Sequence, residues 1–289
     1  MKILITGGNG FIARNLSEGL AAEYEVVSRN SKELDLLEQE QVFDYIKPGR
    51  FDVVIHAATY DAAPRHSSKD PARVLENNLR MFFNLARCGD YFGRMFYFGS
   101  GAEFDRLHWV PKMKEEYFGR YLPSDQYGFS KYIMTKYAQS SGNIYNLRLF
   151  GVFGKYDDWR TRFIPNACAQ AALGKPVVIS QNRAFDFIYV NDLVRIVKWF
   201  IDNQPRKNIY NVCSGQVVDL KSLAGLIVKI AGKHLEIKIE QDGFGGEYSG
   251  DNALLLKELG GFEFSPLGGS LQELYDWYVQ NQQIFVNAA

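Results

Sequence analysis

A tyrosine and a lysine four residues apart are the side chains best suited to acid–base chemistry. Tyr127 and Lys131 lie in the segment Tyr-Gly-Phe-Ser-Lys, and on a helix this spacing places both on one face. A tyrosine that exchanges a proton near neutral pH needs its pKa of about 10 lowered, which a neighbouring cation does. We therefore predict a catalytic tyrosine with a pKa lowered by Lys131. A surface pair is the alternative, because the chain has 17 tyrosines.

A serine at the end of an apolar run adds a hydroxyl. Ser100 follows the predicted strand Met95–Phe98 and Gly99. In open α/β sheets, ligands bind beyond the carboxyl ends of the strands. There a hydroxyl can donate to a carbonyl oxygen as hydride adds, so we predict that Ser100 joins Tyr127 and Lys131.

A glycine-rich turn opens the chain. The segment Gly7–Ala13 fits both Gly-x-Gly-x-x-Ala and Gly-x-x-Gly-x-x-Ala, with an apolar strand before it and helical periodicity after it. Glycines let backbone N–H groups approach a pyrophosphate, and a small residue lets the helix lie near the strand. A plain β-to-α turn is the alternative, but the flanking strand and helix favour dinucleotide binding.

The end of the second predicted strand bears on which dinucleotide fits. An acidic residue there usually binds the ribose of NAD, whereas the 2′-phosphate of NADP suits a cation. The sequence has Arg29 at this place, and Arg14 follows the glycine turn. Guanidinium matches phosphate geometry, so we predict NADP, with NAD as the alternative if both arginines are solvated surface residues.

Short apolar strands alternate with helices in the first half of the chain, which predicts a parallel sheet covered on both faces. The expected strands are Ile3–Ile5, Val26-Val27, Val53–Ile55, Met95–Phe98 and Ile144–Leu149, and the expected helices include Phe11–Leu20, Leu75–Cys88 and Tyr127–Gln139. The rhythm loosens later, where we expect a helix at Ile164–Leu173, a mobile loop at Gln241–Gly250 and a final helix at Leu271–Gln280.

Composition narrows the function classes. Lys+Arg and Asp+Glu are equal at 33 each, so no basic footprint for nucleic acid is expected. No segment has the apolar length of a membrane span, and the N-terminal apolar run is too short for a signal peptide. Cys88, Cys168 and Cys213 are far apart and the four histidines lack metal-ligand spacing, so we expect a cytoplasmic protein with reduced thiols and no metal.

Taken in order, these features resemble the extended short-chain dehydrogenases. The resemblance rests on Gly7–Ala13, Val53–Ala58, Ser100, Tyr127 with Lys131, Leu147–Gly154, Phe187–Asp192 and Tyr210–Gly215. It spans nearly the whole chain. It implies an α/β fold with a doubly wound parallel-sheet Rossmann domain over residues 1–150, returning near 180–215. A smaller mixed α/β sugar-nucleotide lobe would occupy mainly residues 151–289.

The resemblance also implies site residues. Together with Ser100, Tyr127 and Lys131 as the catalytic set, we expect a cofactor-binding and a substrate-binding group. The cofactor would contact Gly7, Gly10, Phe11, Ile12, Arg29, Asp35, Leu36, His56, Ala57, Ala58, Tyr127 and Lys131. The substrate would contact Ser100, Gly101, Asn166 and Arg183. The family suggests a homodimer through the helices Arg73–Cys88 and Tyr127–Gln139.

Departures from the family pattern limit the reaction. The sugar dehydratases carry Asp-Glu directly after the catalytic Ser or Thr, where this chain has Gly101 and Ala102, so elimination of water lacks its general acid and base. The GDP-fucose synthases carry a cysteine at the Ala102 position, so their 3,5-epimerisation is not expected. The arginine that usually precedes Phe-Ile-Tyr-Val by two positions is Phe185 here, and Arg183 lies two residues upstream.

We therefore expect NADPH-dependent reduction of a nucleotide-activated 4-keto-6-deoxyhexose. A nucleotide-sugar 4-epimerase with bound NAD would use the same residues and is the alternative. A non-catalytic dinucleotide sensor or scaffold would need the glycine turn but not Ser100, Tyr127 and Lys131, and the presence of all three argues against it.

Overall fold

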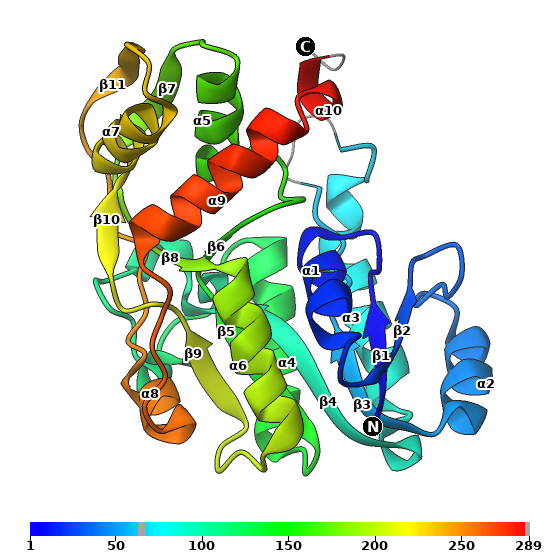
Figure 1. Ribbon diagram of the computed structural model, residues 1–289. Helices are drawn as coiled ribbons and strands as arrows, with labels where there is room; N and C mark the ends of the chain where they lie inside the picture. Colours follow the sequence, from blue (N-terminus) through cyan, green and yellow to red (C-terminus); the bar gives the residue numbers. More distant parts are fainter. Residues whose placement is uncertain (63–66, 287–289) are drawn as a thin grey trace.

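A six-stranded parallel sheet forms the centre of the molecule (Figure 1). The computed structural model describes residues 1–62 and 67–286. The strand order is β2-β1-β3-β4-β5-β9, and all neighbours in this sheet are parallel. The strands are β1 (Lys2–Thr6), β2 (Glu25–Arg29), β3 (Phe51–His56), β4 (Phe92–Ser100), β5 (Ile144–Leu149) and β9 (Ile209–Val212).

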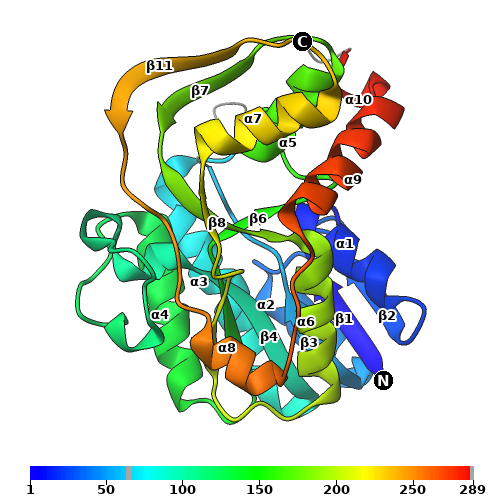
Figure 2. The same cartoon turned by 60° about the vertical axis from the view of Figure 1, so that its left-hand side comes forward.

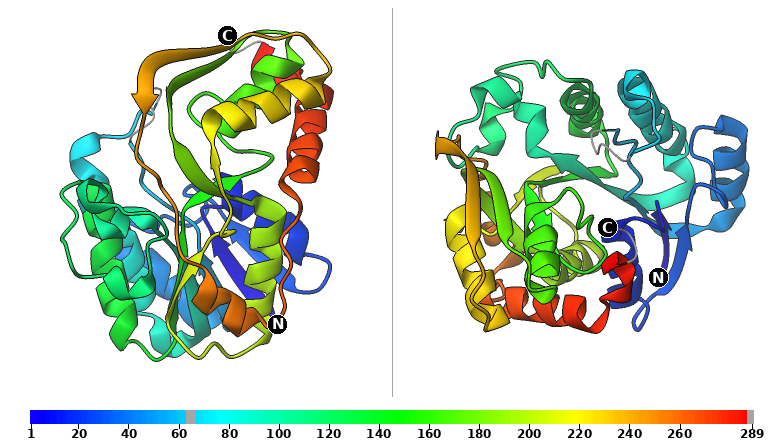
Figure 3. Two further views of the ribbon diagram at one scale, coloured as in Figure 1. Left: turned by 90° about the vertical axis from the view of Figure 1, so that its left-hand side faces the viewer. Right: turned by 90° about the horizontal axis from the view of Figure 1, so that it is seen from above.

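Helices cover both faces of this sheet, as the view from above in Figure 3 shows. They are α1 (Phe11–Leu20) and α6 (Val190–Asp202) on one face, and α2 (Gln39–Gly49), α3 (Val74–Ala86) and α4 (Gln126–Ser140) on the other. Side chains alternate across a strand. Ile3 and Ile5 of β1 accordingly pack in the hydrophobic cluster with α1 and α6, and Leu4 packs in the cluster with α2, α3 and α4. This is the doubly wound α/β fold that the sequence predicted.

The later part of the chain adds a smaller layer beyond the carboxyl edge of the sheet (Figure 2). Its strands are β6 (Gly151–Phe153), β7 (Val177–Asn182), β8 (Ala184–Tyr189), β10 (Val217–Asp219) and β11 (Ile237–Phe244). β10, β8 and β6 form one sheet, and β11 pairs with β7. The helices α5 (Phe163–Ala172), α7 (Leu220–Ala231) and α9 (Leu267–Gln280) share a hydrophobic cluster with them. The short helices α8 (Ala253–Leu259) and α10 (Gln283–Val286) come before and after α9 in the chain.

The segment Gln241–Gly250 differs from its predicted loop. Its first four residues continue β11 as far as Phe244, in parallel pairing with β7. The register shifts between Gln241 and Phe244, where Gly243 has a φ of +85°, as glycines at bulges often do. The glycines that suggested a loop therefore include one at an irregularity within a strand, and the prediction was wrong for this part.

Within the described part of the chain, no helix has both the length and the apolar character needed to cross a membrane. Cys88, Cys168 and Cys213 are buried and free. In residues 1–62 and 67–286, no three His, Cys, Asp or Glu side chains are grouped as metal ligands.

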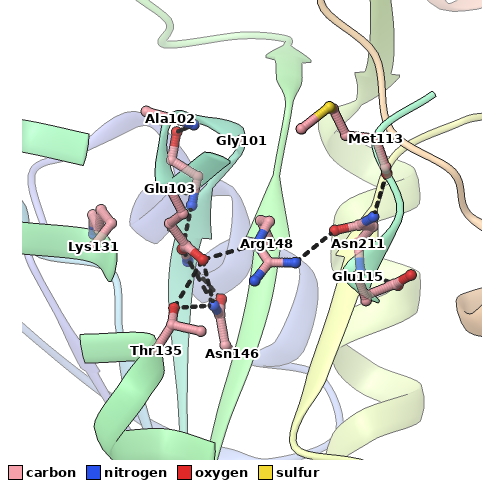
Figure 4. A network of polar contacts seen from close by, with 12 residues as sticks. Gly101, Ala102, Glu103, Met113, Glu115, Lys131, Thr135, Asn146, Arg148 and Asn211 are labelled. Atoms are coloured by element: carbon pink, nitrogen blue, oxygen red, sulfur yellow. Dashed lines mark hydrogen bonds and ion pairs between the residues drawn. The ribbon is translucent and has the colours of Figure 1, made fainter. Parts of the chain in front are cut away.

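A fully buried ion pair joins the end of β4 to its neighbours (Figure 4). Glu103 lies in the short 3₁₀ helix Gly101–Phe104 that follows β4, and its Oε2 accepts a 2.8 Å hydrogen bond from Arg148 Nε on β5. Both side chains are 0% exposed. The same carboxylate accepts from Thr135 Oγ1 of α4 at 2.8 Å and from Asn146 Nδ2 of β5 at 3.2 Å. One carboxylate thus connects β4, β5 and α4.

The guanidinium of Arg148 extends the network to β9. Its Nη1 donates to Asn211 Oδ1 at 2.9 Å, whereas Nη2 has no hydrogen-bond partner among the described residues. The guanidinium carbon lies 4.4 Å from the ring centroid of Phe104 and 5.3 Å from that of Phe118. The faces of these rings attract a cation. Glu103 and the two aromatic rings therefore stabilise the buried positive charge of Arg148 together.

We expect Glu103→Gln to lower the free energy of unfolding by about 3–5 kcal/mol, because it leaves the buried charge of Arg148 without its counter-ion. Urea unfolding followed by circular dichroism measures this. Glu25→Gln is the matched control: its side chain is 67% exposed and 3.7 Å from Lys2 Nζ, so it should change stability by less than about 0.5 kcal/mol. A loss below about 1 kcal/mol in Glu103→Gln would show that Arg148 does not depend on this carboxylate.

Candidate active site

The glycine turn lies beside the end of β3. Gly7 has a φ of +73°, and a Cβ there would lie 2.7 Å from the Cα of Ala58. Only glycine accepts both the positive φ and this backbone contact without strain. Gly10 follows, with its N–H bonded to Gly7 O at 2.7 Å, and no side chain caps the start of α1. The bare N–H groups at this helix start fit a dinucleotide pyrophosphate.

The predicted cofactor residues lie around this turn. Arg29 ends β2 opposite Thr6, and its carbonyl accepts the N–H of Gly8 at 2.9 Å. Its guanidinium donates to the carbonyl of Ser28 at 3.0 Å. Phe11 and Ile12, which begin α1, are half-buried. The arginine that could select a 2′-phosphate therefore borders the glycine turn.

The other residues predicted to lie near the cofactor differ in how deeply they are buried and in what they contact. Asp35 is half-buried and its carboxylate accepts from the N–H of Leu37 at 3.0 Å. The side chain of Leu36 is 5% exposed and packs in the core. Arg14 stacks on the ring of Tyr156, with its guanidinium carbon 3.5 Å from the ring centroid.

Ser100 lies at the carboxyl end of β4, held from two sides. Its N–H donates to Glu103 Oε1 at 3.0 Å, and its Oγ accepts from the N–H of Ala102 at 3.2 Å. The start of α4 packs directly on this loop, because a Cβ on Gly128 would lie 2.6 Å from the carbonyl oxygen of Ala102. That close approach brings Tyr127 into hydrogen-bonding reach of Ser100.

Tyr127 and Lys131 both lie on α4, as their spacing predicted. Lys131 is buried, its Nζ donates to the carbonyl of Phe98 at 2.9 Å, and Nζ is 5.7 Å from the Tyr127 ring centroid. Burial lowers the pKa of Lys131 to about 8, although Glu103 and Asp61 favour its charged form.

The predicted direction of the Tyr127 pKa shift is wrong. Burial, with a smaller contribution from Asp61, raises the pKa of Tyr127 to about 12, and the hydrogen bond from Ser100 only partly offsets this. The ammonium of Lys131 bonds the Phe98 carbonyl instead of the phenol. Tyr127 is therefore protonated at neutral pH and can donate a proton.

His56 is buried at the end of β3, next to the half-buried Ala57 and Ala58. Its Nδ1 is 3.0 Å from Thr6 Oγ1. Burial, together with the charge of Lys131, lowers the pKa of His56 to about 3. The imidazole ring of His56 is therefore neutral and adds no charge to the site.

The predicted substrate residues fall in two places. Asn166 and Arg183 line a cavity of about 470 Å³ in the smaller layer, whereas Ser100 and Gly101 lie at the sheet edge. Arg160 and Arg162 line the same cavity, and guanidinium groups bind phosphates well. The charge of Arg162 also lowers the pKa of Tyr127 slightly.

Sequence reasoning missed two residues that contact the Ser100 loop. Glu103 bonds the Ser100 N–H, and Tyr248 lies against Gly101, where a Cβ would be 2.6 Å from its Oη. Glu103 carried a readable signal, a charged residue directly after a predicted buried strand and its glycine turn. Tyr248 carried none beyond an aromatic residue among glycines, since its contact depends on the tertiary fold.

Comparisons with known proteins identify the family of this chain. The model of the NAD dependent epimerase/dehydratase family matches residues 3–213. A dTDP-4-dehydro-6-deoxy-D-allose reductase of Streptomyces sp is 26% identical, over 96% of this chain and 95% of that protein. The NADP-bound GDP-mannoheptose C4 reductase MlghC from Campylobacter jejuni superposes with a TM-score of 0.83 at 18% identity, covering 96% of this chain and 98% of that one.

A reaction of another type occurs on the same fold. The UDP-glucose 4-epimerase of Thermotoga maritima, solved with UDP-glucose, has a TM-score of 0.82 at 21% identity, covering 98% of this chain and 100% of that one. The family match covers the glycine turn, Ser100, Tyr127 and Lys131, which the fold brings to one edge of the sheet. The chain therefore belongs to the NAD dependent epimerase/dehydratase family, as an NAD(P)-dependent enzyme of the extended short-chain dehydrogenase type.

Proposed function

We propose that this enzyme uses NADPH to reduce the keto group of a nucleotide-activated 4-keto-6-deoxyhexose. The observation that carries the proposal is the arrangement of Tyr127 and Lys131 on α4, whose start packs on the Ser100 loop at the sheet edge. Reduction needs a proton donor at the carbonyl oxygen, and a tyrosine phenol, which keeps its proton at neutral pH, supplies one. The reductase relatives in Streptomyces and Campylobacter support the same reaction class.

Each catalytic residue has a role in this reaction. When bound, the dinucleotide supplies the hydride. Ser100 donates a hydrogen bond to the keto oxygen, and Tyr127 gives that oxygen its proton as the hydride adds to carbon. Lys131 uses one of its N–H groups on Phe98 O, which leaves two for the cofactor ribose. Its charge stabilises the phenolate that Tyr127 becomes.

The substrate would lie between this edge and the arginine cavity. Arg160, Arg162 and Arg183 suit a diphosphate there, with Asn166 beside them. Gly101 and Ala102 provide no side-chain acid or base, so we infer that the enzyme does not dehydrate sugars. A homodimer through the helices at 73–88 and 127–139 and a cytoplasmic location stay predictions.

A 4-epimerase with bound NAD is the second candidate, favoured by the likeness to the Thermotoga enzyme. That reaction begins with removal of a proton from a sugar hydroxyl, for which Tyr127 must be a phenolate. Burial opposes the phenolate of Tyr127, and Arg29 suits an exchangeable NADPH. Both points favour reduction.

The two reactions differ in stoichiometry. We expect oxidation of NADPH in proportion to the sugar reduced, in a panel of dTDP-, GDP- and CDP-activated 4-keto-6-deoxy sugars followed by NADPH absorbance. Tyr127→Phe should lower the rate by about 10²–10⁴-fold, because it removes the proton donor. In parallel, UDP-glucose and UDP-N-acetylglucosamine are incubated without added cofactor. Interconversion of these sugars, with no NADPH consumed anywhere in the panel, would replace the reductase by the epimerase.

Arg29 should determine the choice of dinucleotide. The wild type is expected to bind NADPH more tightly than NADH in a fluorescence titration, and Arg29→Asp to erase or reverse this preference, because the cation for the 2′-phosphate becomes an acid. Lys229→Asp makes a comparable charge reversal on the exposed side of α7 and should leave the preference unchanged. Equal affinities of the wild type for the two cofactors would refute the role of Arg29.

A further inference from the structure

Tyr248 brings a second phenol to the catalytic serine. It follows β11, far along the chain, yet its phenol lies against Gly101, the residue next to Ser100. A Cβ on Gly101 would lie 2.6 Å from its Oη and 2.7 Å from its Cε2. The phenol therefore fills the space at Gly101 that a longer side chain would take.

The position of Tyr248 is fixed by its backbone. Its N–H donates to the carbonyl of Ala184 at 2.9 Å, and its carbonyl accepts from the N–H of Asp186 at 3.0 Å. Both partners belong to β8. The residue is thus anchored on a strand of the smaller layer while its side chain points to the loop after β4.

Aromatic neighbours fix the ring. Its centroid is 4.2 Å from that of Trp109 and 5.2 Å from that of Phe150. The indole N–H of Trp109 donates to the carbonyl of Gly101 at 3.1 Å, which ties this aromatic group to the Ser100 loop. The phenol oxygen consequently has little freedom to move away from the loop at Gly101.

The donors and acceptors of Ser100 indicate which way a hydrogen bond with the Tyr248 phenol would run. A serine hydroxyl has one proton to donate and two lone pairs to accept with. One lone pair of Ser100 Oγ accepts the N–H of Ala102. Burial raises the pKa of Tyr248, so its phenol keeps its proton and can fill the second lone pair. The proton of Ser100 is then left for the side of the site where Tyr127 lies.

We propose that Tyr248 is a positioning residue that donates to Ser100 Oγ and thereby directs the Ser100 hydroxyl toward the reacting oxygen. The inference rests on the proposed carbonyl reduction. In that step the hydride adds to the carbonyl carbon, the C=O electron pair moves to oxygen, and oxygen takes the proton of Tyr127. Tyr248 keeps its own proton throughout and acts only through Ser100.

A double-mutant cycle tests this coupling on the sugar nucleotide that the wild type reduces. Tyr248→Phe keeps the ring and removes one neutral hydrogen bond, so kcat should fall about tenfold with KM nearly unchanged. In a Ser100→Ala background the same substitution should have no further effect on kcat. Tyr189→Phe is the control, because it removes a phenol bonded to Glu273 elsewhere in the smaller layer, and it should retain wild-type kcat. A tenfold loss that persists without the Ser100 hydroxyl would mean a merely structural role and would overturn the inference.

Crystal structures of the wild type and Tyr248→Phe, both with NADP⁺, give a readout that needs no substrate. We expect Ser100 Oγ within hydrogen-bond distance of Tyr248 Oη in the wild type, and more than one Ser100 rotamer in the variant. A wild-type separation beyond about 3.5 Å, or a single unchanged rotamer in the variant, would also overturn the inference. If the wild type reduces no sugar in the panel, the proposed function fails, and the crystal structures still decide the role of Tyr248.

Discussion

The buried ion pair of Glu103 and Arg148 is the interaction on which the geometry of the site depends. Burying two charges costs free energy that is recovered only when the pair has good geometry and further hydrogen bonds. Glu103 meets this requirement with bonds from Arg148, Asn146, Thr135 and the N–H of Ser100. Each of these partners belongs to a different position on β4, β5 or α4. The carboxylate is therefore satisfied only when Ser100 and the helix that carries Tyr127 are both in place.

Burial and neighbouring charges also set the protonation states of the residues at the site. Lys131 is buried next to a neutral His56, and Glu103 and Asp61 are the anions that favour its protonated form. Tyr127 keeps its proton at neutral pH, since a phenol titrates near 10 and burial raises this pKa to about 12. The site thus combines a neutral phenol with a buried cation, and the reduction that we propose uses the proton of the first and the charge of the second.

The features that the sequence predicted best are those that depend on residues close together in the chain. Tyr127 and Lys131 lie on one helix as predicted, and the glycine turn joins β1 to α1 as the flanking strand and helix signals indicated. The alternation of strands and helices predicted the doubly wound fold because each strand must be covered on both faces. Contacts between distant segments could not be read in this way: Glu103 and Arg148 are 45 positions apart. The sign of the Tyr127 pKa shift was missed for the same reason, since it depends on burial by the assembled fold.

The contact between Gly101 and Tyr248 shows how residues far apart in the sequence can limit the reactions that a site allows. Family dehydratases place an acid where this chain has Gly101, and a Cβ at that position would already lie 2.6 Å from the Tyr248 phenol and 2.8 Å from the ring of Phe150. An aspartate at 101 therefore cannot enter while Tyr248 remains between Trp109 and Phe150. Regaining an elimination acid would require the loss of Tyr248 as well, and with it the proposed donor to Ser100. Gly101 and Tyr248 thus form one structural unit, in which the residue that we propose to position the Ser100 hydroxyl also excludes the side chain needed for dehydration.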